Sequence, residues 1–262
     1  MSYALRLSAE EQARYRFMAE QARGAEAPQW AAAGIVPGAR LADIGCGPGA
    51  MLRVLAEAVG SSGAAHGVDQ DADAVAAATE AVDGLGHASA RVGSATDSGL
   101  ELGTYDTVVC RHVLAHNGGR ERAIVEHLAA LARPGGAVLM VDVDGVASRI
   151  FPQDPDLDDL MERYHELHRV KGNDLVIGIK LGWLLERAGL TLTAFRSNAV
   201  LLRMPPGLRP PSWAARDAMV AAGLADADDL DRWKRAIGRL DQLEQRPWAH
   251  LVTFVAVGHR PA

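Results

Sequence analysis

The chain has 262 residues, of which 48 % are hydrophobic and 23 % are charged, a balance typical of a soluble globular enzyme. Its formal net charge is −6 and it contains no basic run, whereas proteins that bind nucleic acid usually carry a basic face that neutralises phosphates. We therefore expect no nucleic-acid partner.

The first 37 residues are expected to form a helical cap. Ser8-Ala9-Glu10-Glu11 has the form of a capping box, which predicts a helix through about Arg23. A second short helix is expected over residues 29–33 and would end at Gly34.

Between residues 38 and 144, short apolar runs alternate with amphipathic stretches. This alternation predicts an α/β fold of the Rossmann-like type, with a doubly wound, mostly parallel sheet and helices on both faces. The predicted strands cover residues 41–44, 66–68, 88–92, 107–110 and 137–143, and the predicted helices cover 50–59, 72–82 and 120–132.

Beyond Asp144 the alternation stops, and Pro152 and Pro155 are expected to mark a linker. We expect residues 145–262 to form the substrate-side half of a single domain, with helical insertions at about 145–174 and 203–248. The helices predicted there cover residues 157–170, 175–188, 213–222 and 228–243, and strands at 190–202 and 251–257 would complete a seven-stranded sheet.

The second insertion is rich in large apolar side chains. It is either an extra helical layer on the sheet or a lid that encloses an apolar metabolite and expels water. The side chains concerned are Trp213, Met219, Trp233 and Trp248.

A glycine-rich turn follows the first predicted strand, in Gly45-Cys46-Gly47-Pro48-Gly49. Glycine allows unusual dihedral angles and close approach of the backbone to a ligand. With Ala50 the turn also fits the dinucleotide pattern G-x-G-x-x-A. Asp69 ends the next strand, where a carboxylate can accept hydrogen bonds from both hydroxyls of a ribose. These features indicate a nucleoside ligand but do not distinguish NAD from an adenosyl compound.

Four segments in chain order carry a resemblance to a known family: Leu41–Gly49, Val92–Asp97, Tyr105–Leu114 and Leu131–Gly136. The series resembles the class I S-adenosylmethionine-dependent methyltransferases, of the type that modifies small molecules and natural products. It covers residues 38 to about 143. A dehydrogenase is not expected to have an acidic residue at Asp97 together with the Pro-Gly-Gly turn before the fifth strand.

The resemblance implies that the cofactor is S-adenosyl-L-methionine and that S-adenosyl-L-homocysteine is a product. Asp43 would orient the methionine portion, the Arg111 backbone would face the cofactor near its sulfonium, and Tyr15 would close over it. The glycines expected to pack under the methionine portion are Gly45, Gly47 and Gly49.

The resemblance also implies contacts with the nucleoside portion. Asp69, with Gln70 beside it, would hold the ribose. Asp97 would meet the adenine amine, and Ala95 and Thr96 would line the adenine pocket.

Methyl transfer depends mainly on aligning a nucleophile and excluding water, and it needs a base only when the acceptor arrives protonated. His112 and His116 follow the fourth strand, at the edge where α/β sheets place ligands. Either is a candidate catalytic base or orienting donor, or else a packing histidine.

The stretch from Glu162 to His168 spaces Glu162, His165 and His168 one helical turn apart. A bundle metal site would need a second Glu-x-x-His helix, which the sequence does not contain. No metal is predicted.

We therefore predict an enzyme that transfers a methyl group from S-adenosylmethionine to an oxygen, nitrogen or carbon of a small metabolite. The alternatives are a non-catalytic S-adenosylmethionine-binding protein and an NAD-dependent oxidoreductase. Cys46 and Cys110 form no CxxC pair, and no apolar run reaches the ~18 residues of a membrane span. We expect a cytoplasmic monomer or homodimer without a membrane partner.

Overall fold

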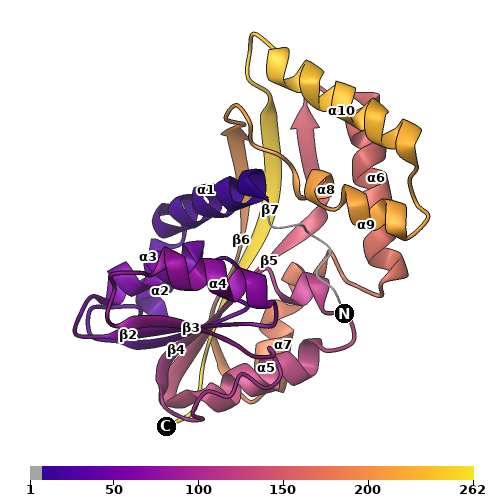
Figure 1. Ribbon diagram of the computed structural model, residues 1–262. Coiled ribbons are helices and arrows are strands. Elements are labelled where there is room, and N and C mark those ends of the chain that lie inside the picture. Colours follow the sequence, from indigo (N-terminus) through magenta and orange to yellow (C-terminus); the bar gives the residue numbers. More distant parts are fainter. Residues whose placement is uncertain (1–7) are drawn as a thin grey trace.

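A seven-stranded sheet runs through the computed structural model, which describes residues 8–262 (Figure 1). The strand order is β3-β2-β1-β4-β5-β7-β6, and β7 is antiparallel to both of its neighbours while β1 to β5 are parallel. The mostly parallel α/β sheet expected from the alternating apolar runs is confirmed. The strands are β1 (Arg40–Ile44), β2 (Ala64–Asp69), β3 (Ala88–Val92), β4 (Tyr105–Arg111), β5 (Ala132–Phe151), β6 (Thr191–Arg203) and β7 (Trp248–His259).

Side chains that alternate along the strands form an apolar layer on each face of the sheet. On one face, Leu41, Val109 and Leu139 pack with Trp30 of α2 (Ala27–Ala32) and Leu55 of α3 (Ala50–Val59). The other face packs against α5 (Glu121–Leu131) and α7 (Leu181–Arg187) through a cluster that includes Val108, Val138, Ile124, Leu128 and Leu185. Cys46 and Cys110 are both buried and free.

Two further helices lie close to the glycine turn. In α4 (Ala72–Ala81), the side chain of Asp71 accepts hydrogen bonds from the backbone of Asp73 and Ala74 and so begins the helix. In α1 (Ala9–Ala25), Ser8 Oγ accepts the Glu11 N–H at 3.2 Å. The capping box is only half formed, because the Glu11 carboxylate pairs with Arg14 instead.

The expected linker at Pro152 and Pro155 connects β5 to the helix that begins at Pro155, but β5 itself runs past its predicted end at Val143 to Phe151. Its register with β7 shifts between Asp144 and Arg149 and then resumes, so that Phe151 faces Trp248. Figure 1 shows β5, β6 and β7 extending together beyond the rest of the sheet. We call this three-stranded extension, from Asp144 to Phe151 with the paired ends of β6 and β7, the arm. The polar and small residues between 144 and 149 interrupt the apolar pattern in the sequence and lie where the register with β7 shifts. Their backbone groups form hydrogen bonds elsewhere: the Gly145 N–H donates to Leu175 O, and Asp144 Oδ1 accepts the N–H groups of Val146 and Ala147.

Four helices lie beside the arm (Figure 1). These helices, which we call the helical layer, are α6 (Pro155–Val170), α8 (Pro211–Ala214), α9 (Arg216–Ala221) and α10 (Ala227–Gln242). The helix predicted at 213–222 is thus two short helices, and the one predicted at 175–188 is a 3-10 turn, η2 (Ile177–Lys180), followed by α7.

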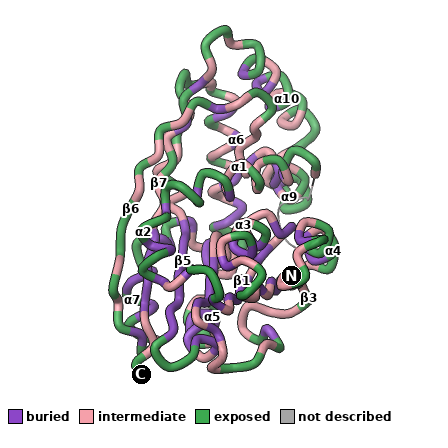
Figure 2. Tube along the Cα trace, turned by 90° about the vertical axis from the view of Figure 1, so that its left-hand side faces the viewer, coloured by how far each residue is buried: buried purple, intermediate pink, exposed green. Residues whose placement is uncertain are grey.

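The helical layer has its own core. Trp233 and Met219 are fully buried, and Trp233 Nε1 donates to Asp159 on α6 at 2.9 Å. Trp248, in contrast, is 40 % exposed on the arm. Figure 2 shows that exposed residues dominate the outer side of α10, whereas buried residues concentrate in the centre of the sheet. Trp233 and Met219 therefore form the packed core of an extra helical layer on the sheet.

Candidate active site

The glycine turn connects β1 to α3 in a conformation that needs glycine at two positions. The N–H groups of Gly45 and Cys46 both donate to Val68 O, at 2.7 and 3.1 Å, which ties the turn to β2. Gly45 and Gly49 have φ of 80° and 81°, which disfavours any other residue. A Cβ on Gly45 would overlap the Val113 side chain, and one on Gly49 would lie 2.6 Å from Ala78 Cα.

Gly47 differs from these two glycines because the space above it is open. Its φ is 52°, and the nearest atom to an added Cβ is Tyr15 Cε1 of α1, at 3.9 Å. Tyr15 therefore lies over the turn, where the sequence predicted that it would close over a cofactor.

Asp43 is the penultimate residue of β1, just before the turn, and is 2 % exposed. Its Oδ2 is buried and has no hydrogen-bond partner among the described residues. Burial raises the pKa of Asp43 to about 7, against the lowering effect of the nearby Arg111 guanidinium. A buried carboxylate without a donor is costly unless a cation or hydrogen-bond donor binds it. The site therefore fits the ammonium group of an amino-acid ligand.

Asp69 ends β2 on the other side of the turn. One carboxylate oxygen accepts the Gly47 N–H at 2.9 Å, and the other accepts the Asp71 N–H at 3.0 Å. Each oxygen keeps a second lone pair, so the carboxylate still has room for two hydroxyl donors. The neighbouring Gln70 side chain is exposed.

The loop after β3 folds back on itself through a backbone bridge between Ser94 and Asp97. Ala95 and Thr96 are partly buried, and Asp97 is exposed. Arg120 donates to Ser94 Oγ at 3.0 Å and to Thr96 Oγ1 at 3.1 Å, which fixes the loop. No local pattern predicts this role of Arg120, because its contacts lie more than twenty positions away.

The N-terminal helices are tied to the end of β4 by a buried ion pair. Arg111 and Glu26 form a hydrogen-bonded pair, and their side chains are 9 % and 7 % exposed. Glu26 also accepts the Trp30 Nε1–H at 3.2 Å. The backbone of Arg111 was expected to face a cofactor, but the role of its side chain was not predicted, because nothing near Arg111 in the sequence relates it to Glu26.

The turn after β4 is held by a second buried carboxylate. His112 has φ of 54°, and its N–H donates to Val141 O at 2.8 Å. Asp142 accepts the N–H groups of Leu114 and Ala115, at 3.0 and 3.2 Å, at the start of η1 (Leu114–His116). Burial raises the pKa of Asp142 to about 7, although these hydrogen bonds oppose the shift. Asp142 thereby positions the segment that carries His116.

His116 lies against His168 of α6, with ring centroids 5.0 Å apart. Burial, and then the positive charges of His168 and Arg14, lower the pKa of His116 to about 3. Burial likewise lowers the pKa of His168 to about 4 and that of His112 well below its usual value. These rings are therefore neutral near neutral pH, and they are weak bases that can still take part in hydrogen bonds.

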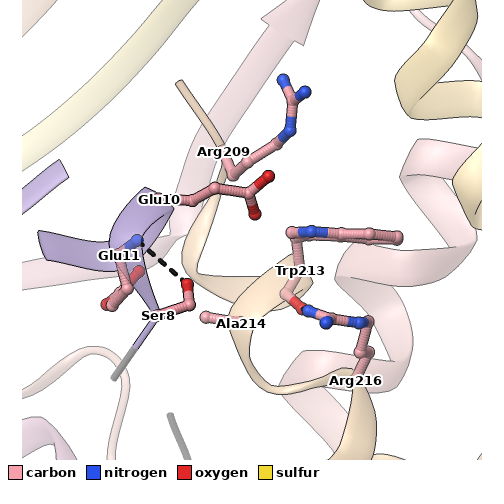
Figure 3. A pocket seen from close by; sticks show the side chains of 7 residues that line it. All are labelled: Ser8, Glu10, Glu11, Arg209, Trp213, Ala214 and Arg216. Atoms are coloured by element: carbon pink, nitrogen blue, oxygen red, sulfur yellow. Dashed lines mark hydrogen bonds between the residues drawn. The ribbon is translucent and has the colours of Figure 1, made fainter. Parts of the chain in front are cut away.

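The helical layer meets the start of α1 at a small hollow (Figure 3). Trp213 and Arg216 line it on one side, with the Arg216 guanidinium 4.4 Å from the centre of the Trp213 ring. Ser8 and Glu11 line it on the other side. Its volume of about 10 Å³ holds roughly one water, so this hollow is a seam between two elements and not a substrate site.

None of the helices between residues 8 and 262 is long and apolar enough to span a membrane. Within the same residues, no three His, Cys, Asp or Glu side chains are grouped so that they could hold a metal ion.

Known proteins resemble this chain in sequence. Residues 41–136 match the family model of a methyltransferase domain. Over 227 residues, 84 % of this chain, the sequence is 30 % identical to an uncharacterised 37.1 kDa protein in transposon Tn4556 of Streptomyces fradiae. Over 104 residues, 39 % of this chain, it is 38 % identical to nocamycin O-methyltransferase of Saccharothrix syringae. The matches span 62 % and 37 % of the length of these two relatives.

Solved structures share the fold. One is phosphoethanolamine N-methyltransferase 2 of Haemonchus contortus, in complex with phosphomonomethylethanolamine and S-adenosylhomocysteine. The similarity covers 87 % of this chain and 50 % of that one, with a TM-score of 0.52 and 17 % identity. At this identity the likeness concerns the fold.

Proposed function

The chain belongs to the class I S-adenosylmethionine-dependent methyltransferases, and we propose that it transfers the methyl group of S-adenosylmethionine to a small-molecule metabolite. The observation that carries the proposal is the buried, unpartnered Oδ2 of Asp43 beside the glycine turn. An amino-acid ammonium group matches that oxygen, and Asp69 at the end of the next strand offers two acceptors for a ribose. A nicotinamide dinucleotide has no ammonium group for Asp43.

The residues around the turn would divide the binding work between the two ends of the cofactor. Asp43 and the backbone of Gly47 would hold the methionine portion, with Tyr15 above it. Asp69 and Gln70 would hold the ribose. The partly buried pair Ala95 and Thr96, kept in place by Arg120, and the exposed carboxylate of Asp97 would contact the adenine.

When bound, S-adenosylmethionine supplies an electrophilic methyl group on a cationic sulfur. The protein would then contribute alignment and exclusion of water. The Arg111–Glu26 pair locks the N-terminal helices over the end of β4, and Asp142 fixes the turn that carries His112 and His116. We propose that His116 faces the acceptor, because it ends the segment at the carboxyl edge of the sheet and lies against α6.

Two measurements test the proposal. Thermal shift and calorimetry should show that S-adenosylhomocysteine stabilises the full chain and that NAD does not. Incubation with methyl-labelled S-adenosylmethionine and the small-molecule fraction of a cell extract should then transfer label to a metabolite. Stabilisation by NAD alone would replace this function with that of an oxidoreductase, and binding without label transfer would identify a non-catalytic cofactor-binding protein.

A further inference from the structure

The apolar stripe of α6 contains a histidine at a position where an aliphatic residue would pack equally well. His168 is 1 % exposed. A buried polar side chain loses the hydrogen bonds that it makes with water, so each one without a partner needs an explanation. The buried residues of the stripe are Leu157, Leu160, Tyr164, Leu167 and His168.

Asn173 determines which nitrogen of His168 carries the proton. Asn173 Oδ1 accepts the Gly118 N–H at 3.2 Å, which orients the amide so that its Nδ2 faces His168 Nδ1 at 3.0 Å. An amide nitrogen can only donate, so Nδ1 accepts and the proton of the neutral ring resides on Nε2. Nε2 is buried and has no partner among the described residues. His168 therefore presents an unused hydrogen-bond donor.

This donor lies beside His116, the residue that we propose faces the acceptor. The His168 ring is 5.0 Å from the His116 ring and 4.5 Å from the Tyr164 ring, measured between centroids. Tyr164 in turn is close enough to Arg14 and Tyr15 of α1 for both to influence its pKa. Since Tyr15 lies above Gly47, the donor is connected to the glycine turn through neighbouring side chains.

We propose that the Nε2–H of His168 binds an oxygen of the methyl acceptor, and that the acceptor is an acidic hydroxyl compound, a phenol or an enol, held as its oxyanion. This inference rests on the proposed function and narrows its substrate class. A fixed N–H donor selects an oxygen with a free lone pair and disfavours an ammonium group, which has none. The buried, neutral rings of His116 and His168 are too weakly basic to take a proton from an ordinary alcohol, which is why an acceptor that ionises by itself fits the site.

The charges and electrons of the transfer then balance without a protein base. The oxygen–carbon bond forms as the carbon–sulfur bond breaks, and the electron pair of the broken bond stays on sulfur. The negative charge of the oxyanion and the positive charge of the sulfonium cancel. No proton has to move in this step.

His168→Phe tests the inference because it keeps a ring of similar size and removes the donor. The full chain and the variant are incubated with ¹³C-methyl S-adenosylmethionine and the small-molecule fraction of a cell extract, and the product is examined by NMR. We expect the label in a methoxy group and a loss of turnover of about tenfold or more in the variant. Affinity for S-adenosylhomocysteine should stay within about twofold, and thermal stability should change little, because phenylalanine removes the unsatisfied Nε2–H together with the hydrogen bond from Asn173.

His165→Phe is the matched control, because His165 lies on the same helix and its Nε2 is also buried without a partner, but its ring contact is with Tyr164 and that of His168 is with His116. Its turnover should equal that of the unchanged chain. If His168→Phe does not fold, Asn173→Ala is the second variant. It leaves His168 in place but removes the hydrogen bond that keeps the proton on Nε2, and ¹⁵N-histidine NMR detects the resulting mixture of tautomers. Turnover should again fall.

Three results would overturn the inference: label on nitrogen or carbon, unchanged turnover in His168→Phe, or a loss of turnover that only follows a loss of stability or cofactor affinity. Failure of the proposed function looks different. In that case the unchanged chain binds S-adenosylhomocysteine and labels no metabolite, so this inference and the activity are lost together.

Discussion

The cofactor side of the sheet and the arm with its helical layer are built by different means. Around β1 and β2, backbone geometry dominates: glycines with positive φ pack against Val113 and Ala78, and Asp69 binds backbone N–H groups. In the helical layer, side-chain ion pairs connect α10 to α6, as in Arg232 with Asp156 and Asp159. Backbone geometry tolerates few substitutions, whereas partly exposed ion pairs contribute little each. The first region should therefore be the less tolerant of change.

The largest effect should come from Gly49→Ala. Its Cβ would lie 2.6 Å from the Ala78 Cα, and the residue would keep φ of 81°, so the α3–α4 contact must open. We expect a loss of about 3 kcal/mol or more in the free energy of unfolding, measured by denaturant titration.

Gly223→Ala in the helical layer is the control for that change. Gly223 also has positive φ, 69°, but an added Cβ would meet no atom within 4 Å. Only the conformational strain remains, so the loss should be about 1 kcal/mol. Equal losses in the two variants would contradict the contrast between the two regions.

The second-largest effect should be a change in stability with pH, which arises from two buried carboxylates on the cofactor side. Asp43 has a pKa of about 7 when folded because it is buried, compared with an ordinary value of 3.8. The folded state therefore binds an extra proton between these values, and stability is full below about pH 4 and decreases as the pH rises through 7. Asp142 contributes in the same direction.

Burial also lowers the pKa values of His112, His116 and His168, and these groups act in the opposite direction, because below about pH 6.5 the unfolded chain binds the additional protons. The contribution of Asp43 is therefore the difference between the ligand-free chain and its Asp43→Asn variant. In denaturant titrations, the stability of the unchanged chain relative to the variant should fall by roughly 1–3 kcal/mol between pH 5 and pH 8. S-adenosylhomocysteine should bind more tightly to the unchanged chain at pH 8 than at pH 6, because its ammonium group pairs with the ionised carboxylate. A difference between the two chains that does not fall over this interval would show that Asp43 is charged in the folded state.

Asp69→Asn should give a smaller effect that appears in binding more than in folding. The amide keeps one oxygen but loses the charge and one acceptor, so calorimetry should show about tenfold weaker binding of S-adenosylhomocysteine. Asp71→Ala is the matched control, because Asp71 caps α4 two positions away. It should lose about 1 kcal/mol of stability and no affinity. Equal affinities in Asp69→Asn and the unchanged chain would remove Asp69 from the ribose site.

Local sequence patterns predicted the cofactor side better than the arm. The strand, glycine turn and helix from Leu41 to Val59 are specified by neighbouring residues, and so is the cap at Asp71. The extension of β5 was missed because its hydrogen bonds come from β7, about a hundred positions later. The pairing of Arg111 with Glu26 and the fixed ring of His168 also depend on contacts with residues outside their own strand or helix. Such contacts leave no pattern in the sequence around either residue.

The smallest effect should come from Trp233→Phe in the helical layer. Phenylalanine fills most of the buried space but loses the 2.9 Å hydrogen bond to Asp159, which keeps its pairing with Arg232 and Arg163. We expect about 1 kcal/mol of destabilisation, with hydrogen exchange accelerated in α6 and α10. Because the change is confined to the helical layer, affinity for S-adenosylhomocysteine should not move. If Trp233→Phe also weakened the binding of S-adenosylhomocysteine, the two regions would unfold as one unit. The difference between backbone geometry on the cofactor side and ion pairs in the helical layer would then have no thermodynamic consequence.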